Sequence, residues 1–329
     1  MTTRIGINGF GRIGRCLTRL LAGDGEIEVA AINARGSNED LARLLKYDSV
    51  HGTFPGEVEA TPGGIKVCGR TIPVTRIPGE QWPWSEMGAS VVVETTGKFT
   101  SHEKACAHLE CGARKVVVSA PAKGADCTIV MGVNEDDYDP ASHRTISAAS
   151  CTTNCLAPVA KAMNDAFGIE RGQMTTIHSY TMSQRILDGS HKDPRRARAA
   201  AMSLIPTTTG AAKAVGLVVP ELAGKLDGYA VRVPTPVGSL VDLTCELSRP
   251  VTKAEVNAVL KEKAGESMGY SEEPLVSADY LGDTHGGVVD GLLTEVTGSR
   301  MAKVVAWYDN EAGFTNQLLR LLRMVSRTM

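Results

Sequence analysis

The sequence predicts an α/β protein in which a doubly wound first domain is followed by a mixed α+β second domain. In the first half of the chain, short apolar runs rich in β-branched residues alternate with amphipathic segments. After residue 150 the pattern changes, and longer runs of strand character outnumber the helical segments. The length of 329 residues suits about two domains of ordinary size.

The elements of the first half follow one another in β–α order. The pattern predicts strands over 3–7, 28–32, 91–94, 115–119, 127–130 and 145–147, and helices over 12–22 and 38–46. Apolar strands separated by helices are typical of a parallel sheet that is covered on both faces. We therefore expect one doubly wound domain over residues 1–150.

The pattern of the second half predicts a catalytic or substrate domain over residues 151–313. We expect helices over 153–168 and 252–265, and strands over 173–178, 228–233, 238–248 and 301–307. The segment 179–210 is long, basic and poor in periodicity, and loops of that length inside compact domains tend to be functional. The C-terminal segment 314–329 contains an amphipathic stretch, which we expect to pack back on the first domain.

Composition excludes several classes of function. A net charge of -2 argues against a nucleic-acid or anionic-membrane partner held by bulk electrostatics. No stretch approaches the ~18 apolar residues of a spanning helix, and the first residues lack the apolar core of a signal peptide. The 8 cysteines do not indicate a disulfide framework in a chain of this length, and Cys151 and Cys155 have no second Cys/His pair beside them. We expect a cytoplasmic protein with no metal site.

The turn after the first strand indicates a dinucleotide site. Residues 9–14 read Gly-Phe-Gly-Arg-Ile-Gly and fit G-x-G-x-x-G between a predicted strand and a predicted helix. Gly9, Gly11 and Gly14 would let the backbone turn tightly and approach a pyrophosphate, whose charge rests on a helix N-terminus in Rossmann-type domains. The alternative is a purely structural βα turn.

The end of the second strand departs from the usual fingerprint. An Asp or Glu about 20 residues after the glycines normally binds the ribose 2′-hydroxyl of NAD, but this chain has Ala34 followed by Arg35. Without the carboxylate, a 2′-phosphate meets no repulsion, and an arginine could pair with it. We therefore predict that NADP is used well. Ser37 with the acidic residues 39–40 is better explained as a capping box of the next helix.

Cys151 is the candidate nucleophile. It lies at the junction of the two halves, just before a predicted helix, where unpaired backbone N–H groups favour a thiolate. His178, at the end of a predicted strand, is the candidate base. The alternatives are a structural cysteine and a hydrogen-bonded core histidine, and we interpret Cys155 as structural.

Hydroxyl and cationic side chains follow that could bind a phosphate dianion. They are Thr181, Thr209 with Gly210, the arginine pair 195–196, and Arg232. For Arg195 and Arg198 a solvated surface or a subunit contact is the favoured interpretation.

Six motifs in order together resemble the phosphorylating glyceraldehyde-3-phosphate dehydrogenase family from end to end. They are INGFGRIGR, SAASCTTNCLAP, HSYT, RRARAAAMSLIPTTTGAAKAVG, RVPTP and WYDNEAGF, beginning at residues 7, 147, 178, 195, 232 and 307. The segment SCTTN with its downstream histidine is highly specific to that family.

The resemblance implies roles for individual residues. Cys151 matches the nucleophile and His178 its base and activator. Thr181 and Arg232 match the pocket for the C3 phosphate of the substrate, and Ser150, Thr152, Thr209, Gly210 and Arg196 match that for the attacking inorganic phosphate. Arg12, Ile13, Arg76 and Ser119 match cofactor contacts, and Asn310 matches the residue that orients the nicotinamide carboxamide. The family is usually a homotetramer in which the loop near 180–204 reaches a neighbouring subunit's cofactor.

Some positions depart from that pattern. NAD-specific members carry Asp where this chain has Ala34, and usually Leu-Pro where it has Gly189-Ser190; the photosynthetic, NADP-accepting members carry a small residue followed by Ser. Both differences favour NADP acceptance. The family's NEWGY segment has Ala312 and Phe314 here, and Val237 replaces an Asn, but neither change removes a reacting group.

The resemblance thus implies oxidation of glyceraldehyde 3-phosphate to 1,3-bisphosphoglycerate through a thioester on Cys151, with hydride transfer to NAD or NADP. Two alternatives remain open at this point. One is an erythrose-4-phosphate dehydrogenase, although that group lacks the HSYT and PTTTG patterns. The other is a cofactor-binding homologue without catalytic activity.

Overall fold

The computed structural model describes residues 2–329, which form two compact units. Of these residues, the first unit contains 2–129, 135–149 and 318–329, and the second contains 130–134 and 150–317. The description below takes each unit by itself.

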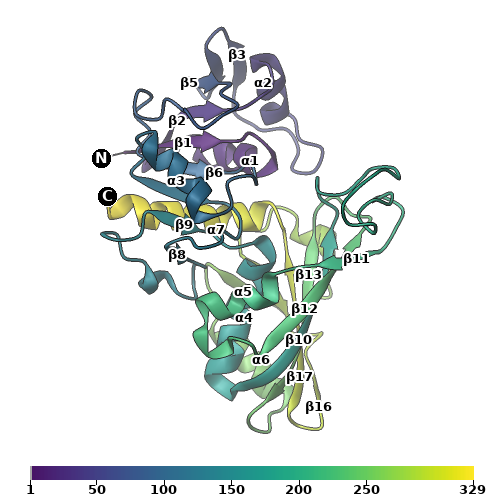
Figure 1. Ribbon diagram of the computed structural model, residues 1–329. Helices are drawn as coiled ribbons and strands as arrows, with labels where there is room; N and C mark the ends of the chain where they lie inside the picture. Colours follow the sequence, from purple (N-terminus) through teal and green to yellow (C-terminus); the bar gives the residue numbers. More distant parts are fainter. Residues whose placement is uncertain (1) are drawn as a thin grey trace. The chain divides into compact units, whose positions relative to one another are not determined.

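The first unit is built on a nine-stranded sheet (Figure 1). Its parallel part has the order β2 (Ile27–Asn33), β1 (Thr3–Asn8), β6 (Val91–Glu94), β7 (Lys115–Val118), β9 (Thr145–Ser147) and β8 (Cys127–Thr128). The chain leaves β1 through α1 (Arg12–Leu21) toward β2 on one side, and β6 pairs with β1 on the other side. The strand order therefore reverses between β1 and β6, which is where open α/β sheets bind their ligands.

Burial explains why these central strands were predictable from sequence. Ile5 and Ile7 in β1 and all of β6 and β7 are buried, as expected for strands with both faces covered. The helices α2 (Asn38–Lys46) and α3 (His102–Glu110) complete the βα units. The predicted doubly wound fold class is confirmed.

One edge of the first sheet was not predicted. The strands β3 (Val58–Thr61), β4 (Gly64–Val67) and β5 (Arg70–Thr75) form an antiparallel meander, and β5 continues the sheet parallel to β2. The sequence analysis also missed α3, and the strand predicted over 127–130 is only two residues long.

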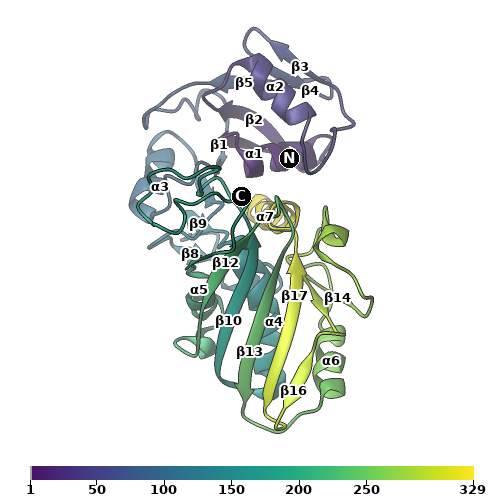
Figure 2. The same cartoon turned by 90° about the vertical axis from the view of Figure 1, so that its right-hand side faces the viewer.

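The second unit has an eight-stranded mixed sheet (Figure 2). Its order is β11 (Ile205–Thr208), β12 (Leu226–Val233), β10 (Ile169–Ser179), β13 (Ser239–Leu247), β17 (Met301–Tyr308), β15 (Gly287–Asp290) and β14 (Met268–Ser271), with β16 (Glu295–Thr297) paired to β17. Strands β10 and β12 are parallel, whereas β13 runs antiparallel to both of its neighbours, β10 and β17.

Helix α4 (Cys151–Phe167) packs on one face of this sheet, beside α5 (Ala211–Val218) and α6 (Lys253–Glu262). Alternate residues of β13 are buried and half-buried, so one face of the strand carries the core. Helix α4 begins at Cys151, two residues earlier than predicted, because the Ser150 hydroxyl accepts a hydrogen bond from the Thr153 N–H and caps the helix.

The last helix, α7 (Ala312–Arg327), has residues in both units. In the first unit, Arg323 donates a hydrogen bond to Asp24, and Arg327 pairs with Glu26. Among the described residues, no helix combines the length and apolarity that a membrane span requires.

Candidate active site

Cys151 and His178 lie next to each other in the second unit. Cys151 is the first residue of α4 and is half-buried, and His178 is the penultimate residue of β10 and is buried. The sulfur lies 3.4 Å from Nε2 of the imidazole. That distance permits direct proton transfer between the two side chains.

Burial disfavours the charged form of both groups. Burial raises the pKa of the Cys151 thiol, although Arg232 and the backbone N–H groups at the start of α4 act in the opposite direction. Burial also lowers the pKa of His178 to about 3, and the Arg232 guanidinium adds to that lowering. Both effects favour a thiol beside an uncharged imidazole.

Arg232 reaches the pair because β12 is parallel to β10 and places residue 232 directly opposite residue 178. Nδ1 of His178 lies 2.7 Å from Nη1 of Arg232 and 2.7 Å from the carbonyl oxygen of Ser179. The carbonyl favours a hydrogen on Nδ1, which leaves Nε2 free to accept the thiol proton, whereas the guanidinium favours a bare Nδ1. Nε of Arg232 is buried and has no hydrogen-bond partner among the described residues.

Besides Arg232, the predicted phosphate-binding residues lie in three places. Ser150 caps α4, and the Thr152 hydroxyl is buried and lies 2.9 Å from the Tyr308 hydroxyl, so both are already hydrogen-bonded. Gly210 precedes α5 without a side-chain cap, and the Thr209 hydroxyl accepts from the Ala211 N–H at 3.2 Å.

The third place is the earlier part of the 179–210 segment, which contains Thr181 and Arg196. Thr181 bonds the Ser183 hydroxyl at 2.8 Å. Arg196 donates to the Thr207 hydroxyl and forms an ion pair with Asp193. Its guanidinium is thus already partnered within the segment.

Asn310 follows β17 and is buried. Its Oδ1 accepts hydrogen bonds from the Gly238 N–H and from the Ser239 hydroxyl, which itself accepts from the Ser179 N–H. The residue predicted to orient the nicotinamide is thereby connected to the residue after His178. Sequence analysis missed Ser239 and Tyr308, because nothing local distinguishes them from other polar residues of strands.

The glycine turn of the first unit is tight and leads directly into α1. Gly9 has a φ of +101°, and a Cβ on Gly14 would lie 2.4 Å from the Gly9 carbonyl oxygen. Gly11 precedes α1 without a side-chain cap, and a Cβ there would meet nothing within 4 Å. The space beside Gly11 is therefore open next to a tight turn and the start of a ten-residue helix, an arrangement that a dinucleotide fits.

The other predicted cofactor residues of the first unit lie at the ends of its strands or beside the turn. Ala34 is buried and donates its N–H to the Thr75 carbonyl, and Arg35 is exposed. Arg12 pairs with Asp48, and Ile13 next to it is half-buried. Arg76 donates to the Gly36 carbonyl at 3.0 Å, and the N–H of Ser119 donates to the Glu94 carbonyl.

Gly189 and Ser190 are exposed in the second unit. The Ser190 carbonyl accepts from the Arg185 guanidinium, and the nearest atom to a Cβ on Gly189 would be 3.7 Å away.

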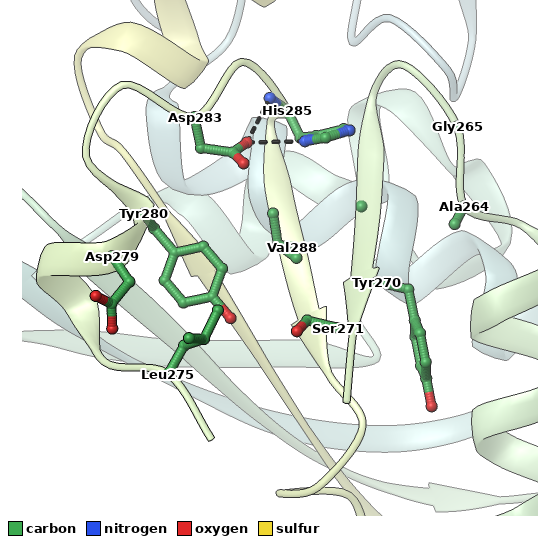
Figure 3. Close-up of a pocket in the computed structure, with 11 residues that line it drawn as sticks. Ala264, Gly265, Tyr270, Ser271, Leu275, Asp279, Tyr280, Asp283, His285 and Val288 are labelled. Carbon is green, nitrogen blue, oxygen red and sulfur yellow. Dashed lines mark hydrogen bonds and ion pairs between the residues drawn. The ribbon is translucent and has the colours of Figure 1, made fainter. Parts of the chain in front are cut away.

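A separate hollow of about 550 Å³ in the second unit contains none of the predicted site residues (Figure 3). It is lined from β14, β15 and the segment before β15, and within it the Asp283 carboxylate accepts from the His285 backbone N–H and lies 2.8 Å from Nδ1 of its ring. Among the described residues, no group of three or more His, Cys, Asp or Glu side chains is arranged to hold a metal ion.

Comparisons with known proteins agree with this geometry. Residues 3–102 match the family described as glyceraldehyde 3-phosphate dehydrogenase, NAD binding domain, and residues 150–310 match the family described as glyceraldehyde 3-phosphate dehydrogenase, C-terminal domain. The chain is 56% identical over 332 residues to the glyceraldehyde-3-phosphate dehydrogenase of Geobacillus stearothermophilus, covering 99% of each chain. It is 55% identical over 333 residues to glyceraldehyde-3-phosphate dehydrogenase 1 of Bacillus subtilis, again over 99% of each chain. It is 52% identical over 337 residues to the Streptomyces coelicolor enzyme of the same name, covering 100% of both.

Proposed function

Since the chain belongs to the glyceraldehyde-3-phosphate dehydrogenase family, we propose that it oxidises glyceraldehyde 3-phosphate to 1,3-bisphosphoglycerate. The observation that carries the proposal is the position of the Cys151 sulfur at the start of α4, 3.4 Å from Nε2 of His178. The family match and the glycine turn support NAD as a cofactor. Bound NAD or NADP would supply the hydride acceptor.

Cys151 attacks the aldehyde carbon as its proton passes to Nε2 of His178, and the imidazolium returns that proton to the aldehyde oxygen, which gives a hemithioacetal. This transfer requires the hydrogen of the neutral imidazole on Nδ1, where the Ser179 carbonyl accepts it. His178 next holds the proton of the hemithioacetal hydroxyl while hydride leaves the same carbon, and a thioester on Cys151 results. Inorganic phosphate then displaces the sulfur and releases the acyl phosphate.

Arg232 is the proposed partner of the C3 phosphate, together with Thr181. A guanidinium binds phosphate through several N–H groups, and one buried N–H of Arg232 has no partner among the described residues. When the guanidinium turns to the phosphate, it releases Nδ1 of His178, so the imidazole is free to act as the base.

The attacking phosphate would be bound at the starts of α4 and α5. Gly210 lacks a side-chain cap, and Thr209 precedes it, so the backbone N–H groups of α5 supply donors. Ser150, Thr152 and Arg196 would contribute after exchanging their present partners.

We propose that NADP is accepted as well as NAD. Ala34 places a methyl group where NAD-specific members have a carboxylate, and Arg35 beside it is exposed. The space around Gly189 supports the same proposal, since no atom would approach a Cβ there closer than 3.7 Å. Arg12, Ile13, Arg76, Ser119 and Asn310 are the other proposed cofactor contacts.

We propose a homotetramer whose subunits meet through the 180–204 segment. This segment exposes an unusual set of large apolar side chains: Met182 (91%), Ile186 (84%), Leu187 (74%), Met202 (81%) and Leu204 (69%). Exposed apolar side chains in such number indicate a protein interface.

All eight cysteines are free thiols, which supports a reducing compartment, the cytoplasm.

The test compares the purified protein with its Cys151→Ser variant. The wild type should reduce NAD in the presence of glyceraldehyde 3-phosphate and phosphate, and the variant should bind NAD but show no turnover. Near-normal turnover by the variant would refute the role of Cys151. A higher kcat/KM for erythrose 4-phosphate would identify the alternative substrate, and ordinary thiol reactivity without turnover would indicate a homologue without catalytic activity.

A further inference from the structure

The first unit contains a cluster of buried titratable side chains that the proposed mechanism does not use. Glu94, the last residue of β6, is 0% exposed. Its carboxylate accepts hydrogen bonds from Asn8 Nδ2 at 2.6 Å, from the Thr96 N–H at 2.6 Å and from the Thr96 hydroxyl, and it lies 3.2 Å from Nε2 of His108. The Thr96 hydroxyl also accepts from the Lys98 N–H, so its own hydrogen is available for Glu94. Every group placed around the Glu94 carboxylate can therefore donate a hydrogen to it.

The Trp84 indole determines which ring nitrogen of His108 carries the hydrogen. The indole N–H of Trp84 lies 3.1 Å from Nδ1 of His108, and an indole nitrogen can only donate. Nδ1 is therefore the acceptor, and the hydrogen of the imidazole lies on Nε2, where it is donated to Glu94. Trp84, His108 and Glu94 are all 0% exposed, so water cannot replace a lost partner.

This chain of hydrogen bonds ends at the position where the strand order reverses. Asn8 is the last residue of β1 and lies directly opposite Glu94 in the sheet. Its Oδ1 accepts from Asn33, the last residue of β2, at 2.8 Å. The backbone nitrogen of Thr96 is 2.9 Å from the position that a Cβ on Gly9 would occupy, so the Thr96 loop packs directly against the glycine turn.

We propose that Trp84 and His108 are positioning residues of the dinucleotide site. By fixing the hydrogen of His108 on Nε2, they keep Glu94 fully hydrogen-bonded. Glu94 in turn holds Asn8 at the end of β1 and Thr96 beside the glycine turn. Without the indole donor, Nδ1 of the buried imidazole is left without a partner, and the ring shifts toward another donor and away from Glu94. The ends of β1 and β6 shift with it, and small shifts of binding groups weaken ligand binding. This inference rests on the proposed binding of NAD or NADP by the first unit.

The test uses Trp84→Phe with Trp82→Phe as a matched control. Trp82 is also buried and stacks on the same imidazole, with ring centroids 4.0 Å apart, but its indole nitrogen has no hydrogen-bond partner among the described residues. Both changes replace a buried indole by a phenyl ring, and only one removes a donor to His108. Calorimetric titration with NAD, in the absence of substrate, should give an affinity about 10-fold lower for Trp84→Phe and within about twofold of wild type for Trp82→Phe.

Steady-state kinetics give a second readout. Trp84→Phe should raise the KM for the cofactor while kcat and the KM for the aldehyde stay unchanged. Equal loss of NAD affinity in both tryptophan variants would overturn the proposal, because packing alone would then explain the cluster.

If Trp84→Phe does not fold, His108→Gln and His108→Leu decide. Gln retains an N–H for Glu94 and should bind NAD more tightly than Leu, and equal affinities would overturn the proposal. Wild-type protein that binds neither NAD nor NADP contradicts the proposed function itself, which is a different outcome.

Discussion

Gly11→Ala separates what the fold requires from what the ligand requires in the glycine turn. A Cβ on Gly14 would lie 2.4 Å from the Gly9 carbonyl oxygen, which is 1.0 Å short of the 3.4 Å at which ordinary contact begins. A Cβ on Gly11 would meet no atom within 4 Å, and the backbone there (φ -77°, ψ -159°) is extended and open to alanine. The protein itself therefore gives no reason for glycine at position 11, and we infer that the reason is the ligand.

The magnitudes follow from this contrast. Gly14→Ala forces the backbone of the turn apart and should lower the free energy of unfolding by roughly 1–3 kcal/mol. Gly11→Ala should cost at most ~1 kcal/mol, the difference between glycine and alanine at a helix N-cap. Its methyl group would occupy the space through which a pyrophosphate reaches the N–H groups of α1. NAD affinity should fall about 10- to 100-fold, or ~1.4–2.8 kcal/mol.

Calorimetric titration with NAD, combined with urea unfolding of the same samples, measures both quantities. The expected result is a Gly11→Ala protein that unfolds like the wild type and binds NAD poorly. If that variant binds NAD within about twofold of the wild type, the pyrophosphate does not approach α1 as we infer. A variant as unstable as Gly14→Ala would show that the space around Gly11 is not free.

Three further predictions concern stability and specificity. Tyr308→Phe removes a buried hydroxyl that lies 2.9 Å from the Thr152 hydroxyl and 2.8 Å from the Thr176 hydroxyl. Urea unfolding should show a free energy of unfolding lower by ~1–3 kcal/mol. An unchanged free energy of unfolding would mean that the two threonines find other partners. Ala34→Asp should lower kcat/KM for NADP at least about 100-fold through charge repulsion with the 2′-phosphate while NAD is still used, and parallel losses for both cofactors would contradict the specificity argument. Burial acts to raise the pKa of Asp48, but hydrogen bonds from Arg12 and from the backbone hold that pKa well below its usual value. Asp48→Asn should therefore lower the free energy of unfolding at pH 7, and the difference from the wild type should shrink as the pH falls below about 4. A difference that stays constant from pH 7 to acid would show that the ionised Asp48 carboxylate does not stabilise the fold.

Sequence patterns predicted the centre of the first sheet well and its edge poorly. The strands β6 and β7 are buried throughout, and each contains an uninterrupted run of three valines, which gives a clear signal; in β1 the buried part is residues 5–8. The meander β3–β5 is largely exposed along β3, and its hairpins turn at glycines that the same analysis did not interpret as turns. Helix α3 packs mainly through alanines and His108, and its apolar pattern is therefore weak.

Cys151 was recognisable because its signal is local: a cysteine at the start of a helix within a specific motif. The partners that support the site are not local. Tyr308 lies 156 residues from Thr152 in sequence, and Glu94 lies 86 residues from Asn8. Such contacts depend on which strands become neighbours and in what register, and a single sequence contains no pattern that specifies them.

Strand register is what brings the proposed chemical groups of the second unit together. The pairing of β10 with β12 places Arg232 opposite His178, and the pairing of β13 with β17 places Ser239 opposite Tyr308, two residues before Asn310. A slip of one residue in either pairing would turn these side chains to the other face of the sheet. Hydrogen bonds from the Ser179 N–H to Ser239 and from Ser239 to Asn310 connect the end of β10, the start of β13 and the end of β17. The base and the amide proposed to orient the nicotinamide are therefore held by one sheet, so a change that loosens β13 should disturb both.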